Sequence, residues 1–367
     1  MSINTGNFAW TVPDSATSIN HLTLDSLPVP TAGPHQVLVR LTAVSLNYRD
    51  LLVATRSPEY PGNHVAGLVP CCDGAGMIHA TGVDSEWTGR EGTRVILHPN
   101  EWMTGDVRNL DLTSLCDLMA YYTGVLQQWI AVDDARLIEA PTHLSSVECA
   151  SLPTAGVTAW SAIRELLDAS LAGELGDWRD GQRLQHKTIL TQGTGGVSYF
   201  AIQIAAALGA TVLATSSSDK KIELAKALGA THGINYTTTP DWDREVLRLT
   251  DGKGVDQVIE LGGARTLLKS VNSVRKGGLV SLIGILSAPQ DVPADIIPSL
   301  LFGSKIVVKG CVAFSRDATA EFARFAEQHG VRPVVAKEFR FNDAVEAFEA
   351  LQNQTEVGKI VINISNQ

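Results

Sequence analysis

The sequence has little of what marks a secreted, membrane-spanning or polyanion-binding protein. Its five cysteines are odd in number, and no charged segment followed by an apolar one begins the chain, which favours the reducing cytosol. No apolar run approaches the roughly 20 residues of a membrane helix, because Gly277, Gly278 and Pro289 interrupt the strongest candidate. The formal net charge of −10 disfavours binding to nucleic acid or acidic membranes, although a local basic patch stays open. We therefore expect a soluble, cytoplasmic protein with no nucleic-acid or membrane partner.

The chain does have the size and composition of a globular protein. It has 367 residues, of which 44% are hydrophobic and 19% charged. A chain of this length can bury a substantial core and favours two domains over one.

The pattern along the chain predicts an α/β fold with a β-rich first part. Up to about residue 150, short β-rich runs such as 36–44 and 94–97 alternate with Gly, Pro and Asp turns. Strands then alternate with helices, and this alternation predicts a parallel sheet covered by helices, as in a Rossmann domain. The expected segments are a helix over 145–167, strands over 188–191, 211–215, 255–260 and 278–285, and helices over 197–208, 220–228 and 264–274.

The last part of the chain predicts a return to the first domain. After about residue 305 we expect a strand, a helix over 319–329 and a final strand over 360–364. The segments 99–124 and 171–186 are expected surface loops that could border a pocket.

A glycine-rich segment follows the strand 188–191 and opens a helix. Glycines permit a tight turn and close backbone approach, and amide groups at a helix start can meet a pyrophosphate. Ser198 stands where a third glycine is common, so an ordinary strand-to-helix turn is the alternative. The predicted phosphate-contacting residues are Gly193, Thr194, Gly195, Gly196 and Val197.

Several motifs together resemble a known family over nearly the whole chain. They are SLNYRDLL at 45–52, DGAG at 73–76, LPTAGVTAW at 152–160, TGGVS at 194–198, KALGATHGINY at 226–236 and VGKIVI at 357–362. The chain resembles zinc-lacking medium-chain dehydrogenase/reductases, especially quinone-oxidoreductase-like and zinc-type alcohol-dehydrogenase-like proteins. The resemblance implies a GroES-like domain over 1–153, a Rossmann domain over 154–304 and a return to the first domain over 305–367. It also implies a homodimer, through exposed sheet edges near 279–285 and 306–312.

The resemblance also implies that no catalytic zinc is bound. Asn47, Cys72 and Thr154 align with the three zinc ligands of zinc-bearing relatives, and Asp73 aligns with an adjacent glutamate. The close run of four cysteines that holds a structural zinc is absent, since Cys116 stands alone there. Only one good zinc ligand remains. Cys72 with its adjacent cysteine and Asp73 could still bind a metal adventitiously.

The end of the second Rossmann strand predicts NADPH as the cofactor. Ser216 aligns with the acidic residue that binds the ribose hydroxyls of NAD, and such an acid would repel the 2′-phosphate of NADP. Ser217 and Lys221 follow, and Tyr236 matches a tyrosine that reaches this phosphate in similar quinone reductases. A solvated Lys221 and a packed Tyr236 are the alternative, and Asp219 leaves room for dual specificity.

Further cofactor contacts are implied by the resemblance alone. Each of these residues also has a structural alternative: a hydroxyl at a helix start for Thr158, a solvated strand-end lysine for Lys359, and packing at strand ends for the others. The residues concerned are Thr158, Leu261, Gly262, Ile283, Gly284, Ile285, Cys311, Ala313 and Lys359.

The expected chemistry is hydride transfer to an activated alkene, enone or quinone with an apolar body. Asn47, Tyr48 and Asp50 are the candidate catalytic residues: an amide donor at the former metal-ligand place, a proton donor and an orienting carboxylate. Capping of a helix start by Asp50, with Arg49 paired to it, is the structural alternative. Reduction of a ketone to an alcohol, and NADPH binding without efficient turnover, remain alternative functions.

Overall fold

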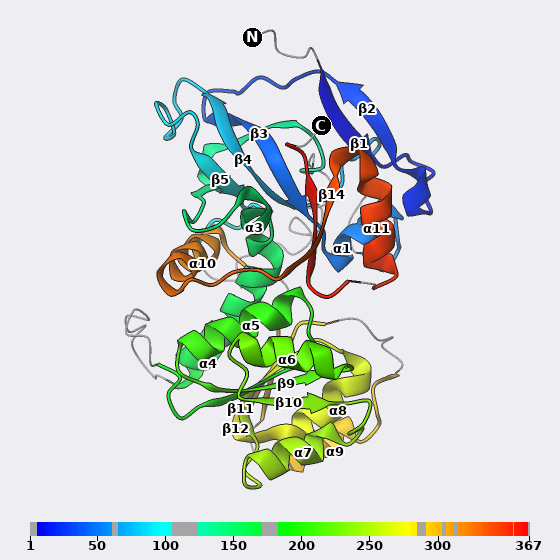
Figure 1. The fold of residues 1–367 in the computed structure, drawn as a ribbon, viewed down its shortest axis with the longest axis vertical. Coiled ribbons are helices and arrows are strands. Elements are labelled where there is room, and N and C mark those ends of the chain that lie inside the picture. The colour runs from blue at the N-terminus through cyan, green and yellow to red at the C-terminus, as the bar shows by residue number, and fades with distance from the viewer. Residues whose placement is uncertain are drawn as a thin grey trace. The chain divides into compact units, whose positions relative to one another are not determined.

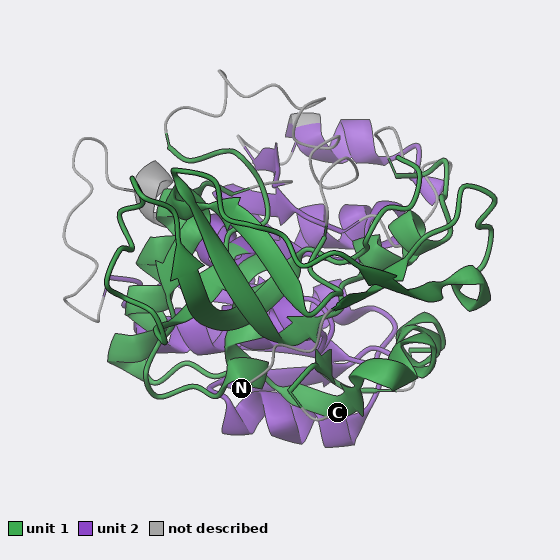
Figure 2. Cartoon of the chain, turned by 90° about the horizontal axis from the view of Figure 1, so that it is seen from above, with its two compact units in different colours: residues 1–157, 314–367 green, residues 158–313 purple. Residues whose placement is uncertain are grey.

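The computed structural model divides the chain into two compact units, each described here by itself (Figures 1 and 2). Unit 1 comprises residues 1–157 and 314–367, and unit 2 comprises residues 158–313. The structure describes residues 6–60, 65–104, 124–170, 183–284, 291–302, 306–311, 314–354 and 356–365.

Unit 1 is built on a mixed sheet centred on β3. Among the described residues its strand order is β14-β15-β3-β4-β5-β7, and β6 also pairs with β3. The pairs are antiparallel except for β14 with β15. The strands of this unit are β1 (Asn7–Thr11), β2 (Thr23–Leu27), β3 (Gln36–Ser45), β4 (Asp73–Thr81), β5 (Arg94–Leu97), β6 (Trp129–Asp133), β7 (Leu137–Glu139), β14 (Val335–Arg340) and β15 (Lys359–Asn363).

The last strand joins the unit to its first residues, as the sequence predicts. β15 pairs with β3, with Val361 opposite Ser45, and the Trp10 indole donates a 2.8 Å hydrogen bond to the Phe341 carbonyl. These contacts bury a common apolar core from both ends of the chain. The helices of the unit are α1 (Tyr48–Ala54), α3 (Ser146–Ala150), α10 (Arg316–His329) and α11 (Ala344–Gln352), with a π-helical segment over Leu152–Val157.

Unit 2 is a doubly wound parallel sheet. Its strand order among the described residues is β10-β9-β8-β11-β12-β13, and every pair is parallel. All six residues of β11 are buried, as expected for a strand covered on both faces. In Figure 1 α5 and α6 lie on one side of this sheet, and α7 and α8 lie on the other. The strands are β8 (Thr188–Thr191), β9 (Thr211–Ser216), β10 (His232–Asn235), β11 (Val255–Glu260), β12 (Val274–Leu282) and β13 (Val307–Gly310); the helices are α4 (Thr158–Ser170), α5 (Gly196–Ala207), α6 (Asp219–Ala227), α7 (Trp242–Leu249), α8 (Ala264–Ser273) and α9 (Ile296–Phe302).

The strand order of unit 2 determines where a ligand is expected. In chain order its strands run 3-2-1-4-5-6, so the winding reverses between β8 and β11. Ligands of open α/β sheets bind outside the carboxyl ends of the strands at this reversal. The segments that leave β8 and β11 therefore flank the expected binding crevice.

The structure differs from three expectations. The helix expected over 145–167 is divided into α3, a π-helical segment and α4, and the π segment coincides with the LPTAGV part of a family motif. β12 lies between β11 and β13, so the expected sheet edge near 279–285 is wrong. The boundary expected at residue 305 lies after residue 313, because β13 pairs with β12.

Other expectations lie partly outside what is described. The described residues do not include positions 105–123 and 171–182, which make up most of the two expected loops. No helix of the described residues is both long enough and apolar enough to cross a membrane.

Candidate functional site

The glycine-rich turn has the backbone that close approach of a ligand requires. Gly193 has φ of +70°, a conformation that side chains disfavour, and its amide donates to the Thr215 hydroxyl at 3.3 Å. A Cβ on Gly195 would meet no atom within 4 Å, so the backbone faces open space. Gly196 and Val197 begin α5 immediately afterwards. The turn therefore presents exposed backbone at the start of a buried helix.

The residue that aligns with the NAD-binding acid lies against this turn. The Ser216 side chain is almost fully buried, and its hydroxyl is 2.8 Å from the Thr194 hydroxyl. The Tyr236 amide donates to the Ser216 carbonyl at 2.9 Å, which places Tyr236 beside the strand end. Asp219 accepts a hydrogen bond from the Asn235 amide at 2.8 Å. The structure thus brings Ser216, Thr194 and Tyr236 together, and Asp219 bonds a neighbouring side chain.

Two further predicted phosphate contacts lie next to these residues in sequence. Ser217 is exposed directly after β9, and Lys221 is partly buried in the first turn of α6. The Tyr236 side chain is 41% exposed, so it is not enclosed in a packed core.

The strand ends of β11 and β12 lie in contact. Leu261 and Gly262 follow β11, and Ile283 and Gly284 follow β12. The amides of Ile283 and Gly284 both donate to the Glu260 carbonyl, at 2.9 and 3.1 Å. A Cβ on Gly284 would lie 1.8 Å from the Leu261 carbonyl oxygen, so only glycine permits this approach.

The remaining unit 2 candidates are dispersed. Thr158 is the first residue of α4 and is partly buried, and Cys311 follows β13 with its thiol 3.3 Å from a Glu165 oxygen. Burial and Glu165 raise the pKa of Cys311 to about 12. The predicted contacts Ile285 and Ala313 lie outside the described residues.

In unit 1, the positions that align with zinc ligands surround a buried carboxylate. Asp73 is fully buried at the start of β4, and it accepts hydrogen bonds from the Asn47 amide at 2.9 Å and the Thr154 hydroxyl at 2.6 Å. The Thr154 backbone amide also donates to it, at 3.1 Å. The Cys72 thiol lies 3.6 Å from both Asp73 and Thr154, and burial raises the pKa of Cys72 well above its usual range. These four side chains therefore bond to one another.

A buried lysine completes this group, which we call the Asp73 network: Asn47, Cys72, Asp73, Thr154 and Lys359. The Lys359 ammonium donates to the Asn47 side-chain oxygen at 2.6 Å and to the Leu46 carbonyl at 2.7 Å. Burial lowers the pKa of Lys359, while the negative charges of Asp73 and Asp50 act in the opposite direction. Lys359 is only 4% exposed, so the alternative of a solvated strand-end lysine is wrong.

The three candidate catalytic residues lie at the start of helix α1, and they differ in exposure and in their partners. The carboxylate of Asp50 is fully buried. It accepts a hydrogen bond from the backbone amide of Asn47 at 2.8 Å and forms an ion pair with Arg49 at 2.9 Å. Burial raises the pKa of Asp50, and the Arg49 charge opposes that shift. These contacts are those of the capping alternative. Tyr48 is 41% exposed, whereas both polar ends of the Asn47 side chain are bonded within the Asp73 network.

The backbone before the Asp73 network adopts a conformation that is unusual for its residue. Cys71 has φ of +72°, in the left-handed region that favours glycine, and its carbonyl accepts from the Val125 amide at 3.0 Å. The Cys71 side chain is buried, and that burial raises the pKa of its thiol. Nothing in the local residue pattern signalled this strain.

A second buried cluster in unit 1 was also missed. The His98 ring lies 3.0 Å from the Thr319 hydroxyl and 2.9 Å from the Asn100 side-chain oxygen, and it is fully buried. Burial lowers the pKa of His98 to about 3, so the ring is neutral near pH 7. The cluster joins the end of β5 to α10.

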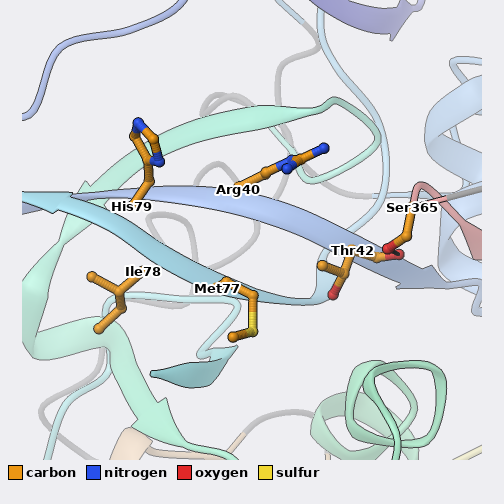
Figure 3. Close-up of a pocket in the computed structure, with 6 residues that line it drawn as sticks. All are labelled: Arg40, Thr42, Met77, Ile78, His79 and Ser365. Atoms are coloured by element: carbon orange, nitrogen blue, oxygen red, sulfur yellow. Dashed lines mark hydrogen bonds between the residues drawn. The ribbon is translucent and has the colours of Figure 1, made fainter. Parts of the chain in front are cut away.

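A pocket of about 290 Å³ opens on the sheet of unit 1 (Figure 3). It is small for a substrate site, and its lining contains none of the candidates discussed above. The lining residues are Arg40, Thr42, Met77, Ile78, His79 and Ser365.

Comparisons with known proteins identify the family. Residues 33–142 match the alcohol dehydrogenase GroES-like domain, and residues 196–328 match the domain described as zinc-binding dehydrogenase. A zinc-type alcohol dehydrogenase-like protein of Schizosaccharomyces pombe is 36% identical over 97% of this chain and 99% of its own length. The chain belongs to the medium-chain dehydrogenase/reductase family. It is accordingly an oxidoreductase of a nucleotide-binding dehydrogenase family.

Solved structures agree with this family. An NAD-dependent alcohol dehydrogenase has a TM-score of 0.82 and 30% identity, covering 97% of this chain and 99% of that one. A mycobacterial quinone oxidoreductase has a TM-score of 0.74 and 21% identity, covering 98% of this chain and all of that one, which shows likeness of fold alone.

Proposed function

We propose that this medium-chain dehydrogenase/reductase is a cytosolic, NADPH-dependent enzyme that reduces an activated alkene, enone or quinone without zinc. The observation that carries the proposal is the Asp73 network. At the places that hold zinc in relatives, an amide, a thiol and a hydroxyl are each hydrogen-bonded to one carboxylate.

The donor chemistry of these residues does not fit zinc. A zinc site needs deprotonated thiolates, imidazoles or carboxylates in tetrahedral geometry. Cys72 is a buried thiol whose pKa is raised, and Asn47 and Thr154 are neutral groups already hydrogen-bonded to Asp73. Elemental analysis of dialysed, active enzyme should find no stoichiometric zinc. One zinc per chain that is required for turnover would contradict the proposal.

The end of β9 supports NADPH over NADH. The turn at Gly193 and Gly195 would hold a pyrophosphate, and the Ser216 hydroxyl lies against Thr194 of that turn. No acidic side chain occupies the Ser216 position, and Lys221 adds positive charge nearby in sequence on α6. This arrangement suits a 2′-phosphate, which an acidic residue there would repel.

Replacing Ser216 with aspartate tests the cofactor assignment. A negative charge there should weaken NADPH more than NADH, by about 1–3 kcal/mol or roughly 5- to 150-fold in affinity. Higher salt should shrink the difference. Dissociation constants for both cofactors at two salt concentrations measure it.

Thr211→Asp is the matched control, because Thr211 is exposed at the other end of the same strand. It adds the same charge away from the turn, so it should leave the NADPH/NADH ratio unchanged. A wild-type preference for NADH, or an unchanged ratio in Ser216→Asp, would refute the NADPH assignment.

The residues of unit 1 would handle the proton that accompanies reduction. When bound, the nicotinamide supplies a hydride. The Tyr48 hydroxyl is the proposed proton donor, since its side chain is 41% exposed while Asn47 and Asp50 are bonded elsewhere. Asn47 and Lys359 would then hold the start of α1, and with it Tyr48, in position. Tyr48→Phe should lower kcat about 100-fold at saturating substrate, and an unchanged kcat would exclude Tyr48.

Carbonyl reduction is the second candidate, favoured by relatives named as alcohol dehydrogenases. Product analysis with a simple enone separates the two reactions. Loss of the double bond supports the preferred proposal, whereas an allylic alcohol supports the alternative. Tight NADPH binding without turnover across carbonyls and alkenes would indicate a binding protein instead.

A homodimer through β13 is proposed for the same chain. β13 has a neighbour on one side only among the described residues, and its Val307 is 52% exposed. Phe302 and Ile297 of the preceding helix α9 are 85% and 64% exposed, which gives an apolar surface beside an open strand. Light scattering should report a dimer that Val307→Lys dissociates and that Val83→Lys, an exposed valine of unit 1, does not. A monomeric wild type would refute the dimer.

A further inference from the structure

The first residue of the glycine-rich turn and the last residue of β11 form a buried pair in unit 2. Gln192 is 5% exposed and Glu260 is fully buried. The Gln192 amide nitrogen donates to a Glu260 carboxylate oxygen at 2.6 Å. Gln192 directly follows β8, and Glu260 is the last residue of β11. The winding of the sheet reverses between these two strands. Neither residue belongs to the candidate site derived from the sequence.

Each side chain of the pair bonds the loop that follows β11. The Glu260 carboxylate accepts from the backbone amides of Gly262 at 2.8 Å and Gly263 at 2.9 Å. The Gln192 side-chain oxygen accepts from the amides of Leu261 at 3.2 Å and Gly262 at 3.1 Å. Because these backbone donors fix the oxygen of Gln192, its nitrogen must face the carboxylate.

Two hydroxyl groups also donate hydrogen bonds to the carboxylate of this pair. Thr266 donates to Glu260 at 2.6 Å, and the fully buried Ser270 also donates to Glu260. Every hydrogen bond found on the carboxylate comes from a neutral donor, and Glu260 has no basic partner among the described residues. A buried carboxylate of this kind is retained at the start of α8 by hydrogen bonds and the helix dipole.

The backbone of Gln192 is held as firmly as its side chain. Its amide donates to the Ile259 carbonyl at 3.2 Å, and its carbonyl accepts from the Ser198 hydroxyl of α5 at 2.7 Å. Gly193, with φ of +70°, comes next. The turn that would approach the pyrophosphate is thus tied to the loop after β11 through a single residue.

We infer that Gln192 and Glu260 are positioning residues for the dinucleotide. Together they set the distance between the glycine-rich turn and the loop 261–263, the two segments that flank the crevice at the strand reversal. They act through these backbones and need not touch the ligand. The inference rests on the proposed nicotinamide-dinucleotide site and adds the residues that hold its two sides in register.

A reciprocal exchange tests the pair, because the amide and the carboxylate can trade places. Gln192→Glu alone places two carboxyl groups at hydrogen-bond distance, and Glu260→Gln alone places two amides there. In the double variant the carboxylate introduced at position 192 would accept from the amides of the loop, and the amide introduced at position 260 would donate to that carboxylate. The backbone donors now bonded to each oxygen would keep an acceptor.

The dissociation constants of NADPH and NADH, measured for the full chain, give the result. For the cofactor that the wild-type protein prefers, each single variant should raise the dissociation constant about tenfold or more. In the double variant this constant should return to within about threefold of the wild-type value. With a simple enone at saturating cofactor, kcat should change much less than the dissociation constant. Should a single variant fail to fold, Ser270→Ala removes the hydroxyl that donates to Glu260 and accepts from the Gln192 amide nitrogen, and it should weaken binding about threefold.

Gln257→Leu is the control for stability. Gln257 is a fully buried glutamine of the same strand, bonded to the Ala162 carbonyl and to Ser281 in the interior of the unit. The substitution should lower the melting temperature and leave the dissociation constant of the folded protein unchanged.

Three results would overturn the inference: unchanged binding in both single variants, a double variant no tighter than the weaker single, or losses of melting temperature without change in binding. A wild type that binds neither cofactor would refute the proposed function as well, so the two failures are distinguishable. Recovery in the double variant, with binding weakened in both singles, supports the pair as positioning residues.

Discussion

A fully buried carboxylate lies at one end of a strand in each unit, and the two are held differently. Asp73 begins β4 in unit 1, within a network that includes the Lys359 ammonium and lies close to the Arg49–Asp50 ion pair. Glu260 ends β11 in unit 2, and all of its donors are neutral. Charged groups thus gather around Asp73 in unit 1, whereas in unit 2 the single charge of Glu260 fixes the backbone of the loop after β11.

The difference indicates different tasks. Neutral donors around Glu260 hold a loop in one position, which suits a cofactor platform. Charged groups around Asp73 are coupled, since Asp50, Asp73, Arg49 and Lys359 each shift the pKa of a neighbour. When a charge changes nearby, the pKa values of such interacting groups change with it. Groups of this kind are common where a reaction moves a proton.

Of the changes that test this comparison, removing the charge of Asp73 should have the largest effect on stability. In Asp73→Asn an amide nitrogen would face the donors of Asn47 and Thr154, and the buried Lys359 would lose a counter-charge. We expect unit 1 to lose about 3–5 kcal/mol of stability. Hydrogen exchange resolved by unit measures it.

Glu260→Gln is the matched change in unit 2. Its partners are neutral, so we expect a smaller loss, about 1–3 kcal/mol. A larger loss in Glu260→Gln than in Asp73→Asn would contradict the distinction between the two sites.

The next largest effect is a difference between the two units in their stability at acidic pH. His98 of unit 1 has a pKa lowered to about 3 by burial, while the unfolded chain binds that proton near pH 6.5. Stability from the neutral ring is therefore complete above about pH 6.5 and declines as the pH falls toward 3, by about 2 kcal/mol at pH 5. In unit 2 the described histidines, His186 and His232, are exposed or partly buried.

Hydrogen exchange at pH 7 and pH 5, corrected for intrinsic rates, should show unit 1 losing more protection than unit 2. His98→Gln is the control, because it removes the titrating ring and should flatten the pH dependence of unit 1. An equal loss in both units would assign the acid sensitivity to other groups.

The smallest effect concerns two of the positions with positive φ, one in each unit. Unit 2 uses glycine at its turn, Gly193 with φ of +70°, whereas unit 1 has Cys71 with φ of +72°. Cys71→Gly should therefore be about 1 kcal/mol more stable than Cys71→Ala, since both lose the thiol and only glycine relieves the backbone. At Gly193 alanine should destabilise by a similar amount. Urea unfolding of the three variants measures this, and Cys71→Ala as stable as Cys71→Gly would show that the backbone there is unstrained.

Sequence reasoning was strongest for unit 2. The strands at 188–191 and 255–260 lie where their apolar runs predict, and the glycine-rich turn follows the first of them. It was weaker for short or exposed elements, and α7, α11 and β14 were not predicted. These segments are short, with eight, nine and six residues, so their structure depends on the surfaces they pack against.

The candidate site shows the same limit. The motif around Asn47 located the right segment, but the sequence left open whether Asp50 acts in chemistry or caps α1, and its contacts are those of a cap. Lys359 was weighed as a solvated lysine and is buried instead. Gln192 directly precedes the predicted phosphate contacts, yet it and its partner Glu260 were missed because a polar strand end is common in a linear pattern.

The sequence by itself determined the family, the alternation of strands and helices in unit 2, and the glycine turn, because these depend on local periodicity and on backbone conformations that few residues tolerate. Only the tertiary structure decided which buried polar groups meet. Lys359 bonds Asn47 across 312 positions of the chain, and Gln192 bonds Glu260 across 68. The physical reason is that burial obliges a polar group to find a partner without specifying which one, and the sheet topology supplies the choice.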